Sequence, residues 1–333
     1  MFNIELIVDI GSSYTTIFEK NKGVVLKEPS YILVKKQMRK YKTLAFGKDA
    51  VRMAMSSSMP EDALEIYPFA SGKVINEEAA KLLIKGFLQT VIAGRLVKPS
   101  MDIICTISCG LSNVERNHLE KVFFSIPLVK NVTLIESPIA ISTLCENRTN
   151  TVVIIGSHLT EIAVVNENGI ITGCSIDICG SKMDEAIVKY VADTYRVAIP
   201  QERAEDLRKA LGSLSDRQQN TQEVAGRNLM DDSKKIIDVT SEDIRIAIVP
   251  IFTKLTEVIG HVISLLPSGI NVDKENIVLA GGVAGTHGIG EFVNMKTGMP
   301  ITVLPDANSI VIGASKFFND KNRMYKMLGL SKN

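Results

Sequence analysis

Two stretches of the sequence share one pattern: IELIVDIGSSYTTIFEKNKGVV at residues 4–25 and TVVIIGSHLTEIAVVNENGIIT at residues 151–172. Each contains a β-branched run, a small-residue turn and a second apolar run, which is the pattern of a β-hairpin. A second turn follows in each stretch, at 19–23 and at 166–169, where glycine permits a tight reversal. The repeat begins close to half-way along the chain, which indicates an ancient duplication into two related lobes with a ligand cleft between them.

Composition narrows the class of protein. A chain of 333 residues is long enough for two domains or one large bilobal unit. Its 38 Lys and Arg against 37 Asp and Glu leave a net charge of +1, so we expect no nucleic-acid partner. The apolar runs 4–10 and 244–251 are short for a membrane span, and a strand beginning near Met1 leaves no room for a signal peptide. Five cysteines without a CxxC pair predict free thiols in a reducing cytosol.

Hydrophobic periodicity predicts the helices and strands between the two hairpins. Helices are expected near 77–93, 113–124, 180–195, 202–211 and 242–266, and strands at 102–108, 132–135 and 276–280. Ser112, with Glu115 three residues on, has the pattern of a capping box, and Ser241 is the expected cap of the longest helix. Pro250 should kink that helix. Residues 31–67 are predicted as strand and loop, and the polar segment 213–226 as a loop or an edge strand.

Two glycine-containing turns follow predicted strands. In the first, Asp9 comes before Gly11, Ser12 and Ser13; a carboxylate and exposed N–H groups at a strand end suit a Mg²⁺–nucleotide phosphate site. A plain hairpin turn is the other interpretation of that motif. In the second, Gly281 and Gly282 open GGVAGTHGIG, where the backbone could approach a ligand closely.

The chain resembles the MreB family of bacterial actins, within the superfamily of actin, heat-shock chaperones and sugar kinases. Five motifs carry the resemblance, in the family's order: VDIGSSYTTIF, LIESPIA, IIGSHLTEIAVV, LAGGVAGTHGIGEF and SIVIGASKFF. Segments typical of MreB lie between them, including GSKMDEAIVKYV, QERAEDLRKALGS and TGMPITV. The resemblance covers essentially the whole chain.

The resemblance implies an α/β, bilobal actin-like fold. Each lobe would hold a mostly parallel five-stranded sheet flanked by helices, with the nucleotide in the cleft between lobes. Four subdomains are then expected: IA from 1–32, 68–140 and 312–333; IB from 33–67; IIA from 141–180 and 241–311; IIB from 181–240.

The resemblance also implies a site for ATP or ADP with Mg²⁺, in which Asp9 lies near the metal. Arg208 stands where the family usually has Lys, and Val283 where it has a third glycine. The residues implied in cofactor binding are Asp9, Gly11, Ser12, Ser13, Thr15, Gly156, Ser157, His158, Glu205, Arg208, Gly281, Gly282, Val283 and Ala284.

Two departures from the family pattern predict weak or absent ATP hydrolysis. The second phosphate loop, usually Asp-Ile-Gly-Gly-Gly-Thr-Thr-Glu, has Ile154 in place of the metal-side Asp and Ser157 and His158 in place of two glycines. The connector, usually Glu-Glu-Pro, has Ser137 where the catalytic Glu would stand. Glu136 substitutes for that Glu only if the backbone shifts, because neighbouring strand residues point to opposite faces. His158 either donates to a phosphate oxygen or fills a partly closed site.

The implied function is that of an MreB-like cytoskeletal protein, which assembles into protofilaments at the inner face of the cell membrane and serves cell shape or motility. The alternative is a non-polymerising regulator or adaptor that binds nucleotide without turnover. Expected partners are other copies of the chain, other MreB-like paralogues and an anionic membrane surface. Membrane contact would come from Leu96 and Val97 and from the basic C-terminal run 316–333, whose last helix packs on its own lobe in the other interpretation.

Overall fold

The computed structural model describes residues 3–38, 40–57, 59–215, 220–267 and 276–330. The chain divides into two compact units. Unit 1 comprises Met1–Glu146, Glu167–Ile170 and Asn308–Asn333; unit 2 comprises Asn147–Asn166 and Ile171–Ala307. Each unit is built on its own five-stranded sheet, as the duplicated hairpin predicts.

The sheet of unit 1 contains both predicted hairpin strands. Its strands, in spatial order, are β10 (Val129–Glu136), β9 (Ser100–Ile107), β1 (Asn3–Ile10), β2 (Tyr14–Glu19) and β3 (Gly23–Pro29). The β10–β9 and β9–β1 pairs are parallel, and the β1–β2 and β2–β3 pairs are antiparallel. The sheet is therefore mixed, with β2 reversed and the other four strands running in one direction.

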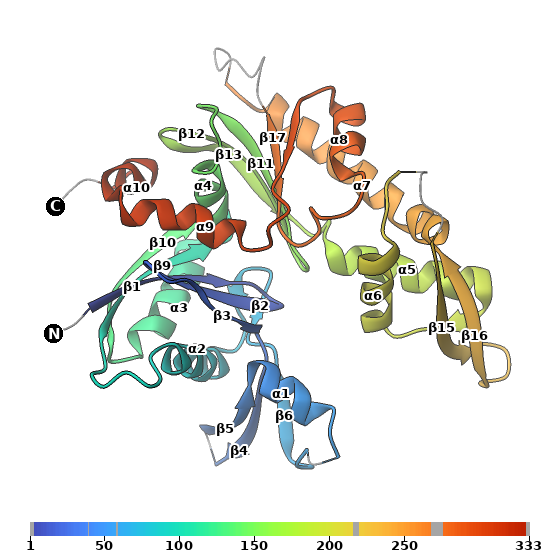
Figure 1. Ribbon diagram of the computed structural model, residues 1–333, viewed down its shortest axis with the longest axis horizontal. Coiled ribbons are helices and arrows are strands. Elements are labelled where there is room, and N and C mark those ends of the chain that lie inside the picture. Colours follow the sequence, from blue (N-terminus) through green and yellow to red (C-terminus); the bar gives the residue numbers. More distant parts are fainter. Residues whose placement is uncertain (1–2, 39, 58, 216–219, 268–275, 331–333) are drawn as a thin grey trace. The chain divides into compact units, whose positions relative to one another are not determined.

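Helices cover both faces of this sheet (Figure 1). α2 (Glu77–Val91) and α3 (Asn113–Phe124) bury Leu83, Phe87 and Phe123 against the face that carries Leu6 and Val8. α4 (Ser137–Ser142) and α9 (Ser309–Ser315) pack together near the opposite face. The capping box of Ser112 and Glu115 is confirmed at the start of α3. β1 ends in a turn directly after Asp9 and Ile10, whereas β10 runs directly into α4 at Ser137.

A smaller sheet belongs to the same unit. It consists of β5 (Lys40–Phe46), β4 (Ile32–Gln37) and β6 (Ala63–Ile66), with α1 (Gly47–Ala54) beside it. The prediction of strand and loop for this region was wrong because it missed the helix α1. This short amphipathic helix buries only Gly47 and Ala50. Two short strands, β7 (Phe69–Ala70) and β8 (Lys73–Val74), complete the set.

The sheet of unit 2 repeats the arrangement. Its strands are β13 (Gly169–Ile176), β12 (Thr160–Asn166), β11 (Asn150–Ile155), β17 (Ile277–Ala280) and β18 (Ile301–Val303), in that spatial order. The β11–β12 pair is antiparallel, and β11–β17 and β17–β18 are parallel. Val153 and Ile155 of β11 enter a core built with α5 (Gly180–Tyr195), α7 (Ser241–Ser264) and α8 (Ile289–Thr297).

The rest of unit 2 is α6 (Gln201–Leu211) and a sheet of β14 (Val197–Ala198), β15 (Thr221–Asn228) and β16 (Lys234–Thr240). Residues 213–226 were predicted as a loop or an edge strand. That prediction was wrong for residues 221–226, because they belong to β15, the central strand of this sheet; residues 216–219 lie outside the described ones. α7 is long and apolar enough to cross a membrane by composition, yet it buries Ile248 and Phe252 in the core. It continues through Pro250.

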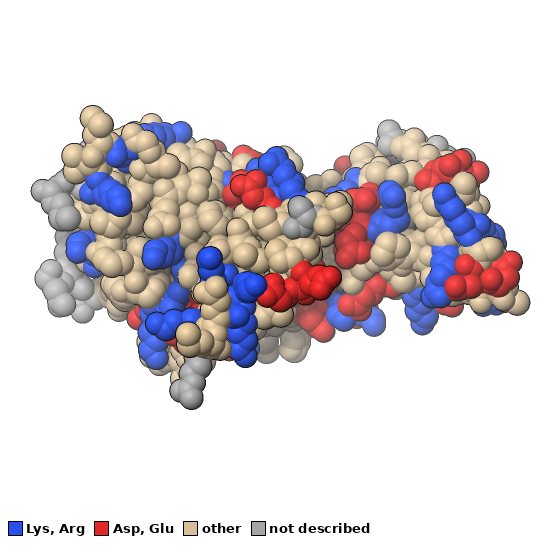
Figure 2. All heavy atoms as spheres, turned by 90° about the horizontal axis from the view of Figure 1, so that it is seen from below, with Lys and Arg blue, Asp and Glu red and all other residues tan. Residues whose placement is uncertain are grey.

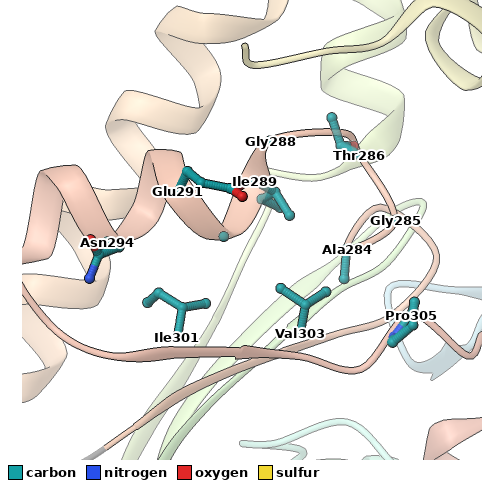
Figure 3. Close-up of a pocket in the computed structure, with 11 residues that line it drawn as sticks. Ala284, Gly285, Thr286, Gly288, Ile289, Glu291, Asn294, Ile301, Val303 and Pro305 are labelled. Carbon is teal, nitrogen blue, oxygen red and sulfur yellow. The ribbon is translucent and has the colours of Figure 1, made fainter.

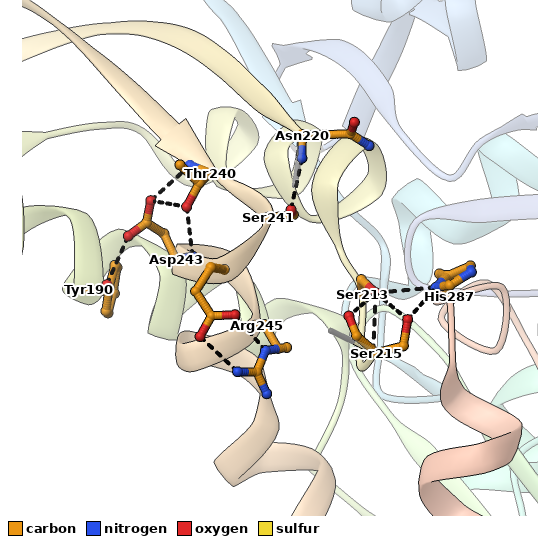
Figure 4. Close-up of polar contacts among 10 residues, drawn as sticks. Tyr190, Ser213, Ser215, Asn220, Thr240, Ser241, Asp243, Arg245 and His287 are labelled. Atoms are coloured by element: carbon orange, nitrogen blue, oxygen red, sulfur yellow. Dashed lines mark hydrogen bonds and ion pairs between the residues drawn. The ribbon is translucent and has the colours of Figure 1, made fainter. Parts of the chain in front are cut away.

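The cap of α7 differs from the prediction. Thr240, not Ser241, is the N-cap, and its hydroxyl accepts from the Asp243 amide at 3.2 Å. The Asp243 carboxylate accepts in turn from the hydroxyls of Thr240 and Tyr190 (Figure 4). It also accepts from the Tyr195 hydroxyl. Ser241 instead accepts from the Asn220 amide through its hydroxyl.

The C-terminal helix α10 (Lys321–Met327) packs on unit 1. Phe317, Met324 and Met327 are buried, and Lys321 lies 3.0 Å from the Glu5 carboxylate. The apolar stripe of this helix is thus used inside its own unit, and the residues after 330 lie outside the described ones.

Candidate nucleotide-binding turns

A row of polar side chains crosses the end of β1. Asp9 pairs with Thr16 on β2 and with Thr106 on β9, and Thr16 pairs with Lys27 on β3. Residues that lie directly opposite across strands share a face, so all four lie on one side of the sheet. The Thr106 hydroxyl donates to Asp9 Oδ1 at 2.6 Å. Burial raises the pKa of Asp9, although the Thr106 hydrogen bond and the charge of Lys27 lower it.

The turn after Asp9 is closed by its own backbone and pinned by Ser30. The Gly11 amide donates to the Tyr14 carbonyl at 2.9 Å, and a Cβ on Gly11 would meet that oxygen at 2.7 Å. The Ser30 hydroxyl donates to the Gly11 carbonyl at 2.7 Å, and its amide donates to the Ser13 carbonyl at 2.9 Å. A side chain at Gly11 would therefore push the turn open.

The other predicted residues of this turn have different surroundings. Ser12 is half-buried, and its hydroxyl accepts from the Ser71 amide at 3.0 Å. Thr15 is fully buried, with its hydroxyl 2.9 Å from that of Ser30. Thr15 therefore holds the turn in shape and has no surface for a ligand. Thr106, Lys27, Ser30 and Ser71 were not predicted. Strand register brings Thr106 and Lys27 to the face of Asp9, and long-range hydrogen bonds bring Ser30 and Ser71 to the turn.

The second turn has the same backbone geometry. The Gly156 amide donates to the Leu159 carbonyl at 2.9 Å, and a Cβ on Gly156 would meet that oxygen at 2.8 Å. The carbonyls of Gly156 and Ser157 accept from the amides of Gly180 and Ser181 at the start of α5. His158 is exposed, with Nδ1 3.0 Å from the Ser157 hydroxyl. The Gly156 and Ser157 carbonyls are therefore engaged in hydrogen bonds with α5, while the His158 side chain is exposed at the surface.

The strand before this turn, β11, has an apolar residue at the position where β1 has Asp9. Ile154 is buried and pairs with Glu161 on β12 and with Ala280 on β17. The pair of Ile154 and Ala280 stands where unit 1 has Asp9 and Thr106. Neither side chain can coordinate or orient a hydrated metal ion.

The connector residues are both engaged. The Glu136 carboxylate forms an ion pair and a hydrogen bond with the Arg116 guanidinium on α3. Ser137 is buried, and its hydroxyl donates to the Ile107 carbonyl at 3.1 Å. The ion pair holds the Glu136 carboxylate toward α3, and the Ser137 hydroxyl is bonded to a carbonyl, which disfavours substitution of Glu136 for the missing glutamate.

Arg208 on α6 lies in a buried ion pair. Its Nε donates to Asp184 Oδ1 at 2.6 Å and its Nη2 to Oδ2 at 3.3 Å, a two-pronged arrangement that Lys could not make. A Cβ on Gly180 would lie 3.2 Å from Nη2 and 3.4 Å from the Ser157 Cα. Arg208 thus supports the second turn from within unit 2. Glu205, one turn earlier, is half-buried and 2.7 Å from the Lys209 ammonium.

The third turn follows β17. Gly281 has a φ of +91°, and a Cβ there would approach the Ile155 carbonyl to 2.5 Å, so glycine is required. Gly282 has nothing within 4 Å of its added Cβ, which leaves its backbone open to a ligand. Val283 and Ala284 are buried in the core, so only their backbone could take part. The Val283 amide donates to the Ile155 carbonyl at 3.1 Å.

A cavity of about 520 Å³ lies beside this turn, between the start of α8 and β18. Figure 3 shows Ile289, Ile301 and Val303 around it, with Glu291 and Asn294 on the helical side. Gly285 and Thr286, which lie within the GGVAGTHGIG motif directly after the implied binding residue Ala284, form another part of its wall. Its size and mixed lining are those of small-ligand sites.

One histidine given no role by the sequence joins two parts of unit 2. His287 Nδ1 lies 3.2 Å from the Ser213 hydroxyl and 3.1 Å from that of Ser215, and the His287 carbonyl accepts from the Leu214 amide (Figure 4). These hydrogen bonds connect the third turn to the segment that follows α6.

A metal bound by side chains alone is not indicated. Among the described residues, His, Cys, Asp and Glu form no group of three or more that could hold an ion. Cys105, Cys109 and Cys179 are buried thiols, and Cys145 and Cys174 are half-buried thiols. A single strand-end carboxylate, Asp9, is compatible with Mg²⁺ that keeps its waters and binds through phosphates.

Two mixed sheets, each with a glycine turn at the end of its central strand, define the actin-like class of proteins. A solved structure of MreB 5 of Spiroplasma citri bound to AMPPNP matches with a TM-score of 0.85 at 22% identity, over 99% of this chain and 100% of that one. A MamK double helical filament matches with a TM-score of 0.78 at 17% identity, over 96% and 99%. The expected bilobal actin-like α/β fold is confirmed.

The chain belongs to the MreB/Mbl protein family, whose model matches residues 3–327. The cell shape-determining protein MreB of Haemophilus influenzae is 27% identical over 92% of this chain and 90% of its own. The family predicted from the five motifs is therefore confirmed.

Proposed function

We propose that this chain binds ATP or ADP with Mg²⁺ and assembles into cytoskeletal filaments. The observation that carries the proposal is the matched pair of turns, in which Gly11 and Gly156 each close a strand end with the same 2.9 Å hydrogen bond. The similar MreB 5 structure is bound to AMPPNP, which supports nucleotide as the ligand of such turns. Other copies of the chain and other MreB-like paralogues would be its partners.

The residues present fit a nucleotide better on the unit 1 side than at the second turn. Asp9 would hold Mg²⁺ through water, and the Ser12–Ser13 backbone would contact phosphate. Gly282 would admit the adenosine part, beside the 520 Å³ cavity that Gly285 helps to line. Glu205 would contact the adenosine part from α6. Mg²⁺, when bound, would neutralise phosphate charge.

Hydrolysis would be weak. Ile154 supplies no carboxylate, Ser137 is bonded to a carbonyl, and Glu136 is paired with Arg116. We infer that nucleotide acts mainly as a conformational ligand for assembly. A role in cell shape or motility follows from the family, and the site of action would be cytoplasmic, at the inner face of the membrane.

The four-subdomain division expected from the sequence is also proposed. The small sheet β5-β4-β6 supports a separate 33–67 subdomain IB, and the β14-β15-β16 sheet supports 181–240 as subdomain IIB.

Membrane contact would rest chiefly on Leu96 and Val97, whose relative exposures are 105% and 66%. Arg95 is not a free cation of that loop, because its guanidinium lies 2.6 Å from the buried Glu19 carboxylate. The C-terminal run would contribute charge chiefly through exposed Arg323, since Lys326 lies 3.5 Å from the Glu167 carboxylate and the apolar face of α10 is used in the core.

Sedimentation with and without Mg²⁺-ATP tests the function. A filament-forming subunit pellets at high speed and shows filaments by electron microscopy, whereas a non-polymerising adaptor stays in the supernatant while still binding a fluorescent ATP analogue. No binding of nucleotide in either state would overturn the proposal.

A further inference from the structure

The β4–β5 hairpin carries an unusual density of cations for a chain with a net charge of +1. Lys or Arg occupy five of the eight positions 35–42 in the sequence KKQMRKYK. Figure 2 shows Lys and Arg gathered over this hairpin on the face seen from below. Lys36, Lys40 and Lys42 are exposed. The nucleotide turns and the family motifs make no use of this cluster.

The strand register places like charges side by side. Lys35 pairs directly with Lys42, and Gln37 with Lys40, so three lysines share one face of the hairpin. Directly opposed like charges destabilise a strand pair. Within the described part of the chain, Lys35 has a carboxylate at 2.6 Å, Asp62, but Lys36, Lys40 and Lys42 have none. The cluster is therefore not arranged for the stability of the hairpin itself.

An apolar side chain stands at the turn. Met38 is 97% exposed, with a φ of +51° that non-glycine residues seldom adopt. Lysines on the edge strand β5 would by themselves protect that edge from unwanted strand pairing. That protection does not require a fully exposed methionine at the tip.

We propose that the tip of the β4–β5 hairpin is a contact site for anionic membrane lipids, in addition to Leu96 and Val97. Met38 would enter the headgroup boundary, and Lys36, Lys40 and Lys42 would bind the surrounding headgroups. Lys36 lies on the opposite face of the hairpin from Lys40 and Lys42, so the cations surround the tip. An anionic membrane surface met end-on is reached by cations on both faces of the hairpin, and its headgroup boundary takes up the apolar side chain at the tip.

The proposal rests on the membrane association proposed above and is tested with the full chain and vesicles. Co-sedimentation compares phosphatidylcholine vesicles with and without phosphatidylglycerol. Each cation near an anionic surface is worth about a fivefold change in partition. Lys36→Gln/Lys40→Gln/Lys42→Gln should lower partition into anionic vesicles at least tenfold, and Met38→Ser a few-fold. Added salt should shrink the difference between the parent and the lysine variant, but not the difference between the parent and Met38→Ser.

Matched controls lie in unit 2. Lys189→Gln/Lys254→Gln/Lys296→Gln removes the same charge from exposed positions, and Met295→Ser removes a methionine that is 71% exposed. These should change partition less than twofold. All variants are surface substitutions, and thermal unfolding checks that they fold.

The possible results distinguish failure of the hairpin site from failure of the proposed membrane association. If Leu96→Ser/Val97→Ser abolishes vesicle binding and the hairpin variants bind like the parent, membrane association stands and the hairpin site is wrong. If the parent does not bind anionic vesicles, both are wrong. Loss of filament pelleting without vesicles in the lysine variant would identify the hairpin as a subunit contact instead. Preferential binding of a single-stranded oligonucleotide would identify it as a nucleic-acid site; either result overturns the lipid proposal.

Discussion

Asp9 and Ile154 occupy the same position in the two halves of the chain. Each is the next-to-last residue of the central strand of its sheet. Asp9 pairs across its hairpin with Thr16, and Ile154 pairs with Glu161, the equivalent residue of the second hairpin. A glycine two residues later closes both turns. The two halves therefore share this backbone arrangement, but only the first has a carboxylate with hydroxyl neighbours at this position.

Restoring that chemistry should raise ATP hydrolysis. Ser137→Glu with Ile154→Asp supplies a general base and a metal-side carboxylate, and a positioned base is worth roughly 10²–10⁴-fold. We expect phosphate release to rise at least tenfold, at some cost in melting temperature because Ile154 is buried. The isosteric control Ser137→Gln/Ile154→Asn should not gain activity. Parent turnover equal to that of the restored variant would contradict the inferred weakness.

Asp9 should matter more for Mg²⁺-ATP than His158 does. Asp9→Ala removes the carboxylate that Thr106 orients, and we expect at least a tenfold loss of affinity in Mg²⁺ that largely disappears in EDTA. His158→Gly should change affinity only a few-fold, because the side chain projects outward. Titration with a fluorescent ATP analogue measures both. An equal or greater loss at His158 would show that the second loop has become a phosphate contact.

Substitutions at the adjacent glycines Gly281 and Gly282 should affect different properties, stability at the first and nucleotide affinity at the second. Gly281→Ala places a Cβ 2.5 Å from the Ile155 carbonyl at a φ of +91°, so we expect a marked drop in melting temperature. Gly282→Ala meets nothing within 4 Å and should melt like the parent. It should nevertheless weaken nucleotide binding, because its methyl group would occupy the open side of the turn. Unchanged affinity in Gly282→Ala would exclude this turn from the binding site.

The capping box of α3 predicts a pH dependence of stability. Hydrogen bonds from Lys73 and Ser112 lower the pKa of Glu115 to about 2 from its usual 4.5. A carboxyl with a depressed pKa in the folded state stabilises above its unfolded pKa, and that stabilisation is lost as the pH falls from 4.5 toward 2. Glu115→Gln should therefore cost about 1 kcal/mol at pH 7 and progressively less below pH 4.5.

Urea unfolding at several pH values measures this difference, with Glu120→Gln on the same helix as the control. A cost at Glu115 that does not diminish in acid would mean that the side chain stabilises α3 by packing and not by its charge.

Local patterns were sufficient for most of the architecture. The Ser112 capping box, the span of α5 and the paired hairpins all follow from short-range sequence signals. The cap of α7 could not be predicted, because Thr240 and Ser241 are both good caps and the choice depends on the distant hydroxyls of Tyr190 and Tyr195. The burial of Thr15 likewise depends on Ser30, which register brings beside it. Long-range pairing decides which predicted site residues face outward.

Asp243 makes one carboxylate common to three elements of unit 2. It accepts from Thr240 at the end of β16, from Tyr190 within α5 and from Tyr195 at its end, at 2.7, 2.9 and 2.8 Å. Release of any one element would leave a buried charge short of donors, which is costly. The start of α7, the end of α5 and β16 should therefore open together, and their slowest amide protons should exchange with deuterium at one common rate.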